Sequence, residues 1–295
     1  MKKSILMLAA VAFCGTTAFA QLENKKGEAY LPESGDWSVG IDATPFLNYV
    51  GNMFNGNTSM NNAPGWNFLN GNNTIIGKMY TSETSAYRAI VRIGLNSNHT
   101  SMMIGDATAA APTYPTPPSM KEDEMKWGNN FIGLGAGMEM RRGKTRLQGL
   151  YGADFMFWMT SSSQSYTYGN ALSSTVTVNP GTTSNFGSNM TTDTYGNSAR
   201  ITEWKSGSTM GLGVRGFIGA EYFVFPKVSV GGEFGWGIGF TSTGASSTTM
   251  ESVGGAGPGV GSQTLTGGKS GGLHIDTDQN MFGTGSASLR LNLHF

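Results

Sequence analysis

The chain has 295 residues, of which only 13% are charged, and its 19 basic and 19 acidic residues cancel. This sparse, balanced charge gives no electrostatic basis for binding nucleic acid, so we expect no nucleic-acid partner. Glycine is abundant, at 44 residues, and after the first 20 residues no apolar run reaches the length of about 18 that a membrane-spanning helix needs.

The first 20 residues have the features of a secretory signal peptide. Two lysines precede a short apolar stretch, 5–13, and Ala18-Phe-Ala20 supplies the small residues of a cleavage site. We expect the mature chain to begin near Gln21, and the loss of the two lysines leaves 17 basic against 19 acidic residues. Cleavage also removes Cys14, the only cysteine, which excludes disulfides and thiolate sites from the mature protein.

Eight later segments alternate apolar and polar side chains, as a β-strand with one apolar face does. They cover approximately 37–48, 72–80, 86–96, 129–141, 145–160, 208–223, 228–241 and 281–295. The third shows the pattern best, with Tyr87, Ala89, Val91, Ile93 and Leu95 on one face and Arg88, Ile90, Arg92 and Gly94 on the other. The second fits least well, because its polar Lys78 would be out of place if that face of the strand contacted lipid.

The connections between these segments alternate in length. Three are short, at 81–85, 142–144 and 224–227, and four are long, at 50–71, 97–128, 161–207 and 242–280. Short periplasmic turns alternating with long extracellular loops are typical of an up-and-down transmembrane β-barrel. A soluble β-sandwich, the alternative, has no reason to keep all its long loops at one end.

The sequence therefore predicts an all-β fold, namely an eight-stranded antiparallel up-and-down transmembrane β-barrel with short periplasmic turns and four long extracellular loops. The barrel domain covers 36–295. It follows the signal peptide, 1–20, and a periplasmic N-terminal segment, 21–35.

Ionisable side chains occupy the alternate strand positions that do not belong to the apolar face. In a membrane barrel, the side chains at these positions would point into the interior. An eight-stranded barrel is only wide enough inside for side chains, so we expect five arginines and five carboxylates to form ion pairs there. The predicted interior ion pairs involve Asp42, Arg88, Arg92, Glu139, Arg146, Asp154, Arg215, Glu221, Glu233 and Arg290. This even balance favours a rigid salt-bridged plug over an ion pathway.

Aromatic residues near strand ends or on outward faces are predicted to anchor the protein at the two membrane interfaces. These residues are Trp37, Tyr80, Tyr87, Tyr151, Tyr222, Trp236 and Phe295.

Several short motifs resemble chemical sites but lack the context that such sites need. The GxGxxG at 211–216 lies inside a predicted strand with no helix after it, so we attribute its glycines to crowding in a narrow barrel. The GxSxG at 268–272 lies in a glycine-rich loop without the strand and helix of a nucleophile elbow. Asp276-Thr-Asp278-Gln-Asn280 departs from a calcium loop because Met281 stands where glycine is required.

Three histidines, His99, His274 and His294, are the candidates for a general base. His274 lies two residues from Asp276, a spacing that any polar strand edge also shows. We therefore expect no catalytic residue, no cofactor and no metal. A barrel enzyme that acts on lipid or peptide, using His274 or Ser270, stays open as an alternative.

The long predicted loops consist mainly of Ser, Thr, Gly and Asn, and the second contains a stiff polyproline-like stretch at 111–118. Such sequences cannot bury a core of their own, so we expect them to be mobile or to fold back partly through extended strand tips. Loops on a rigid scaffold often carry function. The predicted role is capture of a surface partner, either a protein or a glycan.

Three parts of the chain resemble small outer-membrane β-barrel proteins of the OmpA and OmpX type. They are the stretch 219–237 with its proline-centred turn, the hairpin 138–147 and the Leu-x-Leu-x-Phe ending of 287–295. The resemblance implies location in the Gram-negative outer membrane, contact with lipid and lipopolysaccharide, and insertion by the barrel-assembly machinery. In it, Leu291, Leu293 and Phe295 form the assembly signal.

The chain departs from full-length OmpA proteins because it has no peptidoglycan-binding domain after the barrel. We therefore expect a non-enzymatic integral outer-membrane protein with a structural or surface-interaction role. The alternative is a narrow channel or an accessory subunit of an outer-membrane transport complex.

Overall fold

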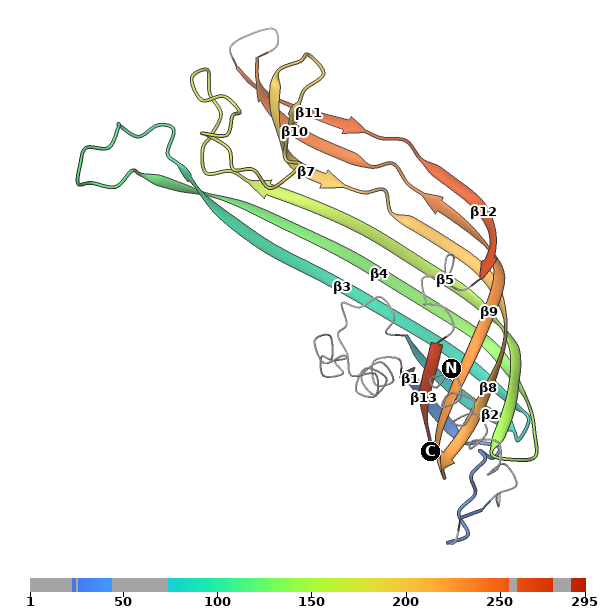
Figure 1. Cartoon of the computed structure of the whole chain (residues 1–295). Coiled ribbons are helices and arrows are strands. Elements are labelled where there is room, and N and C mark those ends of the chain that lie inside the picture. Colours follow the sequence, from blue (N-terminus) through green and yellow to red (C-terminus); the bar gives the residue numbers. More distant parts are fainter. Residues whose placement is uncertain (1–22, 25, 44–73, 255–258, 278–287) are drawn as a thin grey trace, which may run out of the picture.

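The computed structural model of the chain describes residues 23–24, 26–43, 74–254, 259–277 and 288–295 (Figure 1). All regular structure in these residues is β, and thirteen strands join in one sheet whose pairs are all antiparallel. The all-β, antiparallel prediction is confirmed. In this part of the chain, no helix has the length and apolar character needed to cross a membrane. The predicted signal peptide and the predicted loop 50–71 lie outside the described residues.

The strands are β1 (Trp37–Asp42), β2 (Ile75–Ser82), β3 (Ser85–Gly105), β4 (Met120–Arg142), β5 (Leu147–Thr167), β6 (Met190–Thr192), β7 (Ser198–Lys205), β8 (Thr209–Phe225), β9 (Val228–Thr243), β10 (Ser247–Val253), β11 (Val260–Thr266), β12 (Ser270–Thr277) and β13 (Ser288–His294).

Eight of these strands close into a ring. The pairing runs β1–β2–β3–β4–β5–β8–β9–β13 and returns to β1, with every neighbour antiparallel. The start of the first strand and the last residue of the chain meet in this closure, because Trp37 and Phe295 exchange two backbone hydrogen bonds, of 3.1 and 2.8 Å. The eight ring strands correspond to the eight predicted segments.

Burial alternates along the ring strands, most clearly on β8 and β9. Residues 211–218 and 231–240 alternate there between buried and exposed without exception. The outward set is apolar, for example Ile218 at 65% exposure and Phe240 at 54%. The buried set includes Arg215 and Glu233. A soluble protein would place these two kinds of side chain the other way round.

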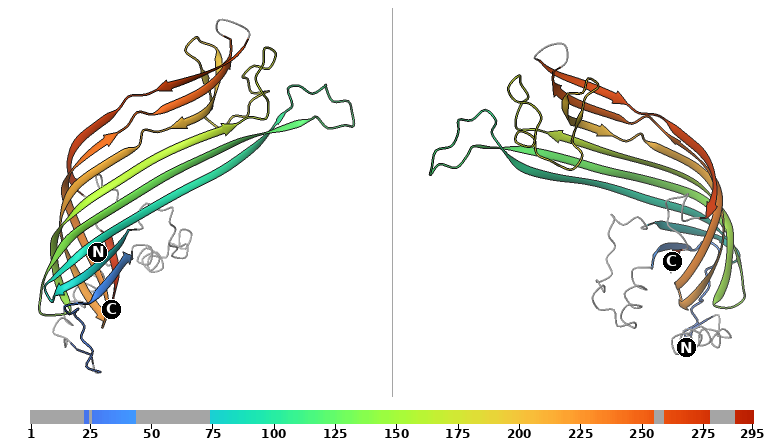
Figure 2. Two further views of the ribbon diagram at one scale, coloured as in Figure 1. Left: turned by 180° about the vertical axis from the view of Figure 1, so that it is seen from behind. Right: turned by 45° about the horizontal axis from the view of Figure 1, so that its top comes forward.

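Five further strands form an upper sheet that extends the ring on one side. β3, β4 and β5 continue past the ring, β7, β10 and β11 join them in turn, β6 pairs with β7, and β12 pairs with β9. Figures 1 and 2 show this extension as a curved wall rising from the ring. The predicted loops at 97–128 and 242–280 are therefore largely strand, and the loop at 161–207 is strand in part, at 161–167, 190–192 and 198–205. Their Ser- and Thr-rich segments satisfy their backbone groups by pairing with strands that already exist.

The upper sheet also buries a small core, which contradicts the expectation that these loops have none. Leu172, Val176, Val178, Ala199 and Met250 are all buried there. The segment 168–189 is held over the sheet mainly by polar groups. Asp123, which is fully buried, accepts hydrogen bonds from the backbone nitrogens of Gly169 and Ser184, both at 2.8 Å.

Candidate functional site

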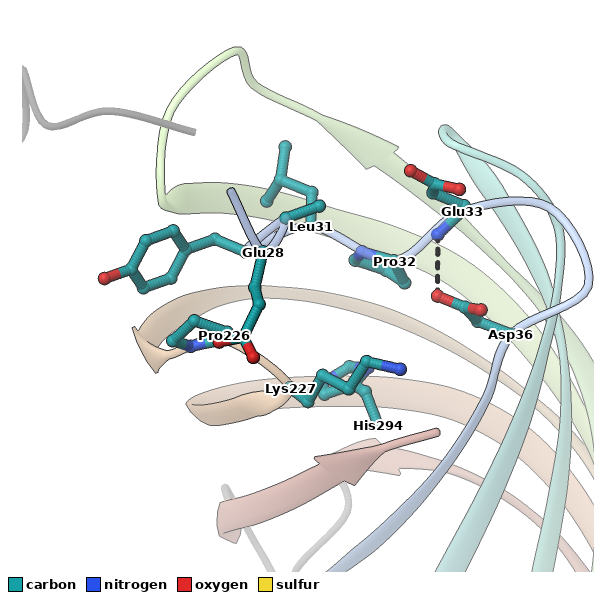
Figure 3. Close-up of a pocket in the computed structure, with 10 residues that line it drawn as sticks. Glu28, Leu31, Pro32, Glu33, Asp36, Pro226, Lys227 and His294 are labelled. Carbon is teal, nitrogen blue, oxygen red and sulfur yellow. Dashed lines mark hydrogen bonds between the residues drawn. The ribbon is translucent and has the colours of Figure 1, made fainter. Parts of the chain in front are cut away.

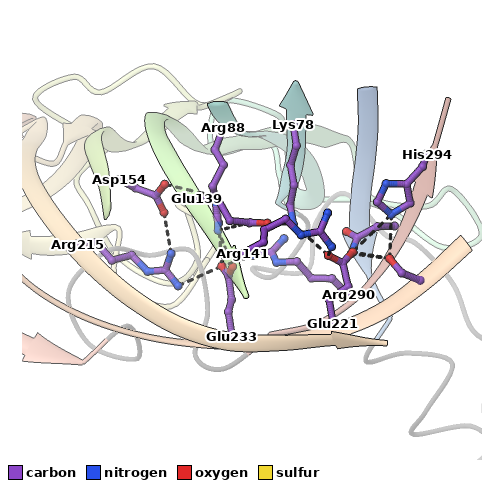
Figure 4. Close-up of polar contacts among 12 residues, drawn as sticks. Lys78, Arg88, Glu139, Arg141, Asp154, Arg215, Glu221, Glu233, Arg290 and His294 are labelled. Carbon is purple, nitrogen blue, oxygen red and sulfur yellow. Dashed lines mark hydrogen bonds and ion pairs between the residues drawn. The ribbon is translucent and has the colours of Figure 1, made fainter. Parts of the chain in front are cut away.

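The interior of the ring holds a buried network of charged side chains centred on Arg88 (Figure 4). Its Nη1 lies 3.1 Å from Glu139 Oε2 and 3.0 Å from Glu233 Oε2, and its Nε lies 3.4 Å from Asp154 Oδ1. Arg215 bridges two of the same carboxylates, at 2.8 Å from Asp154 and 3.1 Å from Glu233. One guanidinium thus faces three carboxylates, a geometry that its forked set of donors permits.

A second part of the network lies toward the short turns. Lys78 Nζ is 2.9 Å from Glu139 Oε2 and 3.8 Å from Glu221 Oε2, and Arg141 Nη2 is 2.7 Å from Glu221 Oε2. Arg290 Nη2 lies 3.7 Å from Glu233. Because each of these charges is buried, removal of one side chain leaves its buried partners with fewer opposite charges, which is unfavourable.

Seven of the ten predicted interior residues meet in this network: Arg88, Glu139, Asp154, Arg215, Glu221, Glu233 and Arg290. Arg92 and Arg146 instead stack on aromatic rings, Phe131 at 4.0 Å and Tyr30 at 3.7 Å. The side chain of Asp42 lies outside the described residues, although its backbone is the register partner of Arg290.

Lys78 and Arg141 also belong to the network, although the alternation pattern did not predict them there. Along β2 the buried side chains are Ile76, Lys78 and Tyr80, so its inward face mixes apolar and charged residues and its parity is hard to read. Arg141 is two residues from Glu139 on β4 and therefore lies on the same face. This spacing is the signal that would have identified it. The interface role predicted for Tyr80 is wrong, because its ring is 1% exposed and lies 5.1 Å from the Arg141 guanidinium.

At the turn end of the network, Ser229, His294 and Glu221 lie together and resemble a nucleophile with its base. Ser229 Oγ is 3.0 Å from His294 Nε2 and also donates a hydrogen bond to Glu221. Glu221 approaches the same nitrogen of His294, at 3.5 Å. A catalytic triad needs the carboxylate on the opposite nitrogen, Nδ1, and a serine that a substrate can reach. Ser229 is fully buried, so the geometry fits a structural hydrogen-bond cluster.

The N-terminal segment lies against this turn end. Gly35 donates to the Tyr80 carbonyl at 2.8 Å, and the Tyr80 amide donates to Asp36 at 2.9 Å, which adds 34–36 to the edge of the ring. A cavity of about 370 Å³ remains between this segment and the β8–β9 turn (Figure 3). It is lined in part by Glu28, Pro226 and His294.

On the other side of the network, an apolar layer closes the interior of the ring. It consists of Ile76, Ile90, Met156 and Trp158, with Phe131 packed against it. Gly211, from the GxGxxG motif, lies under the indole of Trp158, where any Cβ would overlap the ring. The motif therefore provides space in the interior, as the sequence analysis predicted. The interior of the ring thus holds a layer of paired charges beside a layer of buried apolar side chains.

The remaining candidate residues are not brought into a common site. His274 Nε2 lies 3.0 Å from Thr241 Oγ1, and His99 Nε2 lies 3.4 Å from Glu124. Ser270 begins β12 and is exposed. Residues 278–280 lie outside the described part of the chain, and among the described residues no group of three or more His, Cys, Asp or Glu is placed to hold a metal ion.

Comparisons of the chain with protein-family models, with curated protein sequences and with solved structures found no match.

Proposed function

We propose that the ring is an eight-stranded transmembrane β-barrel of the outer membrane, exported through the predicted signal peptide. Its role is non-enzymatic: the barrel anchors the upper sheet, which contacts partners outside the cell. Lipid and lipopolysaccharide surround the barrel, and the barrel-assembly machinery inserts it with Leu291, Leu293 and Phe295 as the assembly signal.

The observation that carries this proposal is a sharp apolar boundary on the outer face. Ile93, Ile132, Met159 and Met210 are register neighbours on four adjacent strands and form the last apolar row. The next outward row contains one apolar side chain, Leu95, beside Asn130 and Ser161. The three outward pairs that follow on β3 and β4 contain only polar residues and glycine: Ser97 with Gly128, His99 with Lys126, and Ser101 with Glu124. A change from apolar to polar side chains at a similar level on neighbouring strands is expected where hydrocarbon gives way to water.

The height of the apolar band supports the same assignment. On β9 the outward apolar side chains extend from Val230 to Phe240, which is about 33 Å of strand at about 3.3 Å per residue. A strand tilted by about 40° then rises about 25 Å along the barrel axis, which equals the apolar band of outer-membrane barrels.

The assembly signal occupies a position consistent with this role. Leu293 and Phe295 are 40% and 64% exposed, on the outside of the ring, while Asn292 and His294, which precede them, are buried. Leu291 is partly exposed on the same face. The closing strand thus presents three apolar side chains outward.

The deciding experiment expresses the full chain in a Gram-negative host, separates the membranes and tests the protein for heat-modifiable migration on electrophoresis. We expect it in the outer-membrane fraction, extractable only with detergent and migrating faster before boiling. A mature protein that is freely soluble without detergent would refute the proposal.

The buried, ion-paired side chains in the interior favour a plug over a diffusion pore, and planar-bilayer recording tests this directly. We expect no steady current steps from the wild-type protein. Current steps that change in Arg88→Ala or Glu139→Ala would instead support a narrow channel.

A further inference from the structure

An aromatic cleft lies on the inward face of the upper sheet, beyond the apolar layer. Trp127 on β4, Gln164 on β5 and Trp204 on β7 are register partners and form one row across three strands. Two neighbouring strand spacings separate the indoles by about 10 Å. Tyr166 and Phe186 form one wall, with ring centroids 6.0 Å apart, and the cleft encloses about 440 Å³. This volume is within the range of small-ligand sites.

The cleft contains no charged side chain among the residues that line it. The nearby charged side chains lie on the opposite face of the sheet because side chains alternate along each strand. Lys126 and Glu203 are in the next row of register partners, with Ser165 between them. Arg200 and Asp123 share the face of the cleft, but both are buried beneath the segment 168–189, and Arg200 is paired with Glu251 at 2.7 Å. A ligand of this cleft is therefore expected to be neutral.

The polar groups in the cleft are amides and hydroxyls. Tyr166 Oη donates to Gln164 Oε1 at 2.9 Å, which occupies the oxygen of that amide and keeps Nε2 as a donor. Asn129, Ser162 and Ser188 also line the cleft. The two indoles are half-buried, so each keeps part of its surface available to a ligand.

We propose that this cleft binds a neutral oligosaccharide, with sugar rings packed on Trp127 and Trp204 and their hydroxyls bonded to Gln164 and Asn129. A sugar ring has an apolar C–H face that packs on an indole, and hydroxyls that exchange hydrogen bonds with amides. A separation of about 10 Å between the tryptophans suits a disaccharide unit. Phosphorylated sugars near a membrane surface need cationic side chains, which the cleft lacks, so the ligand is a soluble glycan chain. The inference rests on the proposed function only in placing the upper sheet outside the cell.

The test is isothermal titration calorimetry on the detergent-purified full-length protein. The probes are hexasaccharides of glucose, mannose, galactose and N-acetylglucosamine. We expect at least one to bind with a dissociation constant in the millimolar range or below. We expect Trp127→Ala and Trp204→Ala each to weaken binding about tenfold, and Trp204→Phe to retain most of it.

The matched controls are Lys126→Ala and Lys205→Ala, each next to a cleft tryptophan in sequence but on the other face of the sheet. Both should bind like the wild type, and the affinity should not change with salt, because no ion pair forms. The inference would be overturned if none of the four sugars bound, or if the tryptophan variants bound a sugar as tightly as the wild type does. Binding of a synthetic peptide of residues 111–118 in place of the sugars would also overturn it.

The two proposals fail separately. A heat-modifiable outer-membrane protein that binds no sugar contradicts the glycan cleft alone. A water-soluble protein that binds sugar contradicts the membrane assignment alone.

Discussion

Lys78 and Glu139 are 61 residues apart in the chain, and their side chains meet at 2.9 Å inside the ring. The two strands that carry them, β2 and β4, are not neighbours but are each paired with β3. The contact therefore reaches across β3 on the inward face of the ring, and through Arg88 and Glu221 it connects both parts of the network.

Glu139→Ala should destabilise the folded protein strongly, because it leaves Lys78 and Arg88 buried near fewer carboxylates. We expect a loss of about 3–5 kcal/mol in the free energy of unfolding, measured by urea denaturation in micelles. Lys78→Met should cost less, since Glu139 keeps Arg88. Lys144→Ala, at an exposed turn position, is the control and should stay within about 0.5 kcal/mol. Equal effects of all three would contradict a cooperative network.

Arginine substitutions on the outer face should show where the apolar band ends. Phe155→Arg, within the band, should cost about 2–4 kcal/mol in a lipid bilayer, and Ser161→Arg, just beyond it, about 0–1 kcal/mol. Both positions lie on the outward face of β5, so the pair differs mainly in depth. The measurement is reversible unfolding from lipid vesicles. Similar costs at the two sites would mean that the band does not contact hydrocarbon.

Gly211→Ala should destabilise the protein because the new methyl group overlaps the Trp158 indole. Overpacking of this kind costs about 1–3 kcal/mol. Gly261→Ala is the matched control on β11, where no atom lies within 4 Å of the added carbon. The measurement is the temperature at which the fast-migrating folded band on electrophoresis converts to the unfolded band. Restoration of stability in the Gly211→Ala, Trp158→Leu double variant would identify the indole as the obstacle.

Deletion of Phe295 should reduce the amount of protein assembled in the outer membrane. The residue supplies an exposed aromatic side chain and two backbone hydrogen bonds that help to close the ring with Trp37. Quantitative blotting of membrane fractions gives the assembled amount. Phe295→Tyr keeps both features and should assemble normally, and normal levels of the truncated protein would exclude an assembly role.

The turn at 193–197 in the upper sheet should loosen in acid. A hydrogen bond from the Asn197 side chain, aided by one from Ser252, lowers the pKa of Asp193 from 3.8 to about 2. Because the folded pKa lies below the unfolded value, the carboxylate stabilises the turn above about pH 4, and this is lost as the pH falls toward about 2. The protection factors of the Tyr195 and Asn197 amides, which compare each observed exchange rate with the intrinsic rate at the same pH, should fall across that interval. In Asp193→Asn these protection factors should not change between pH 4 and pH 2.

Strand alternation and connection length were sufficient to predict the eight ring strands and most of the interior residues. A period of two assigns each side chain on a strand to one of two faces, so Arg88, Glu139, Asp154 and Arg215 could be placed inward without knowledge of their partners. This inference failed on β2. Ile76 and Lys78 share its inward face, so apolar and polar side chains do not separate onto opposite faces of this strand.

The sequence by itself determined which side chains share a face, because alternation is a local property of an extended backbone. The tertiary structure decided which of those side chains meet, as Lys78 and Glu139 do across β3, since register and ring closure depend on distant strands. It also decided that parts of the predicted loops, at 97–105, 120–128, 198–205, 247–253, 260–266 and 270–277, are strands. Their polar sequences carry weak periodicity, and they become ordered only because β5 and β9 offer them unpaired backbone groups.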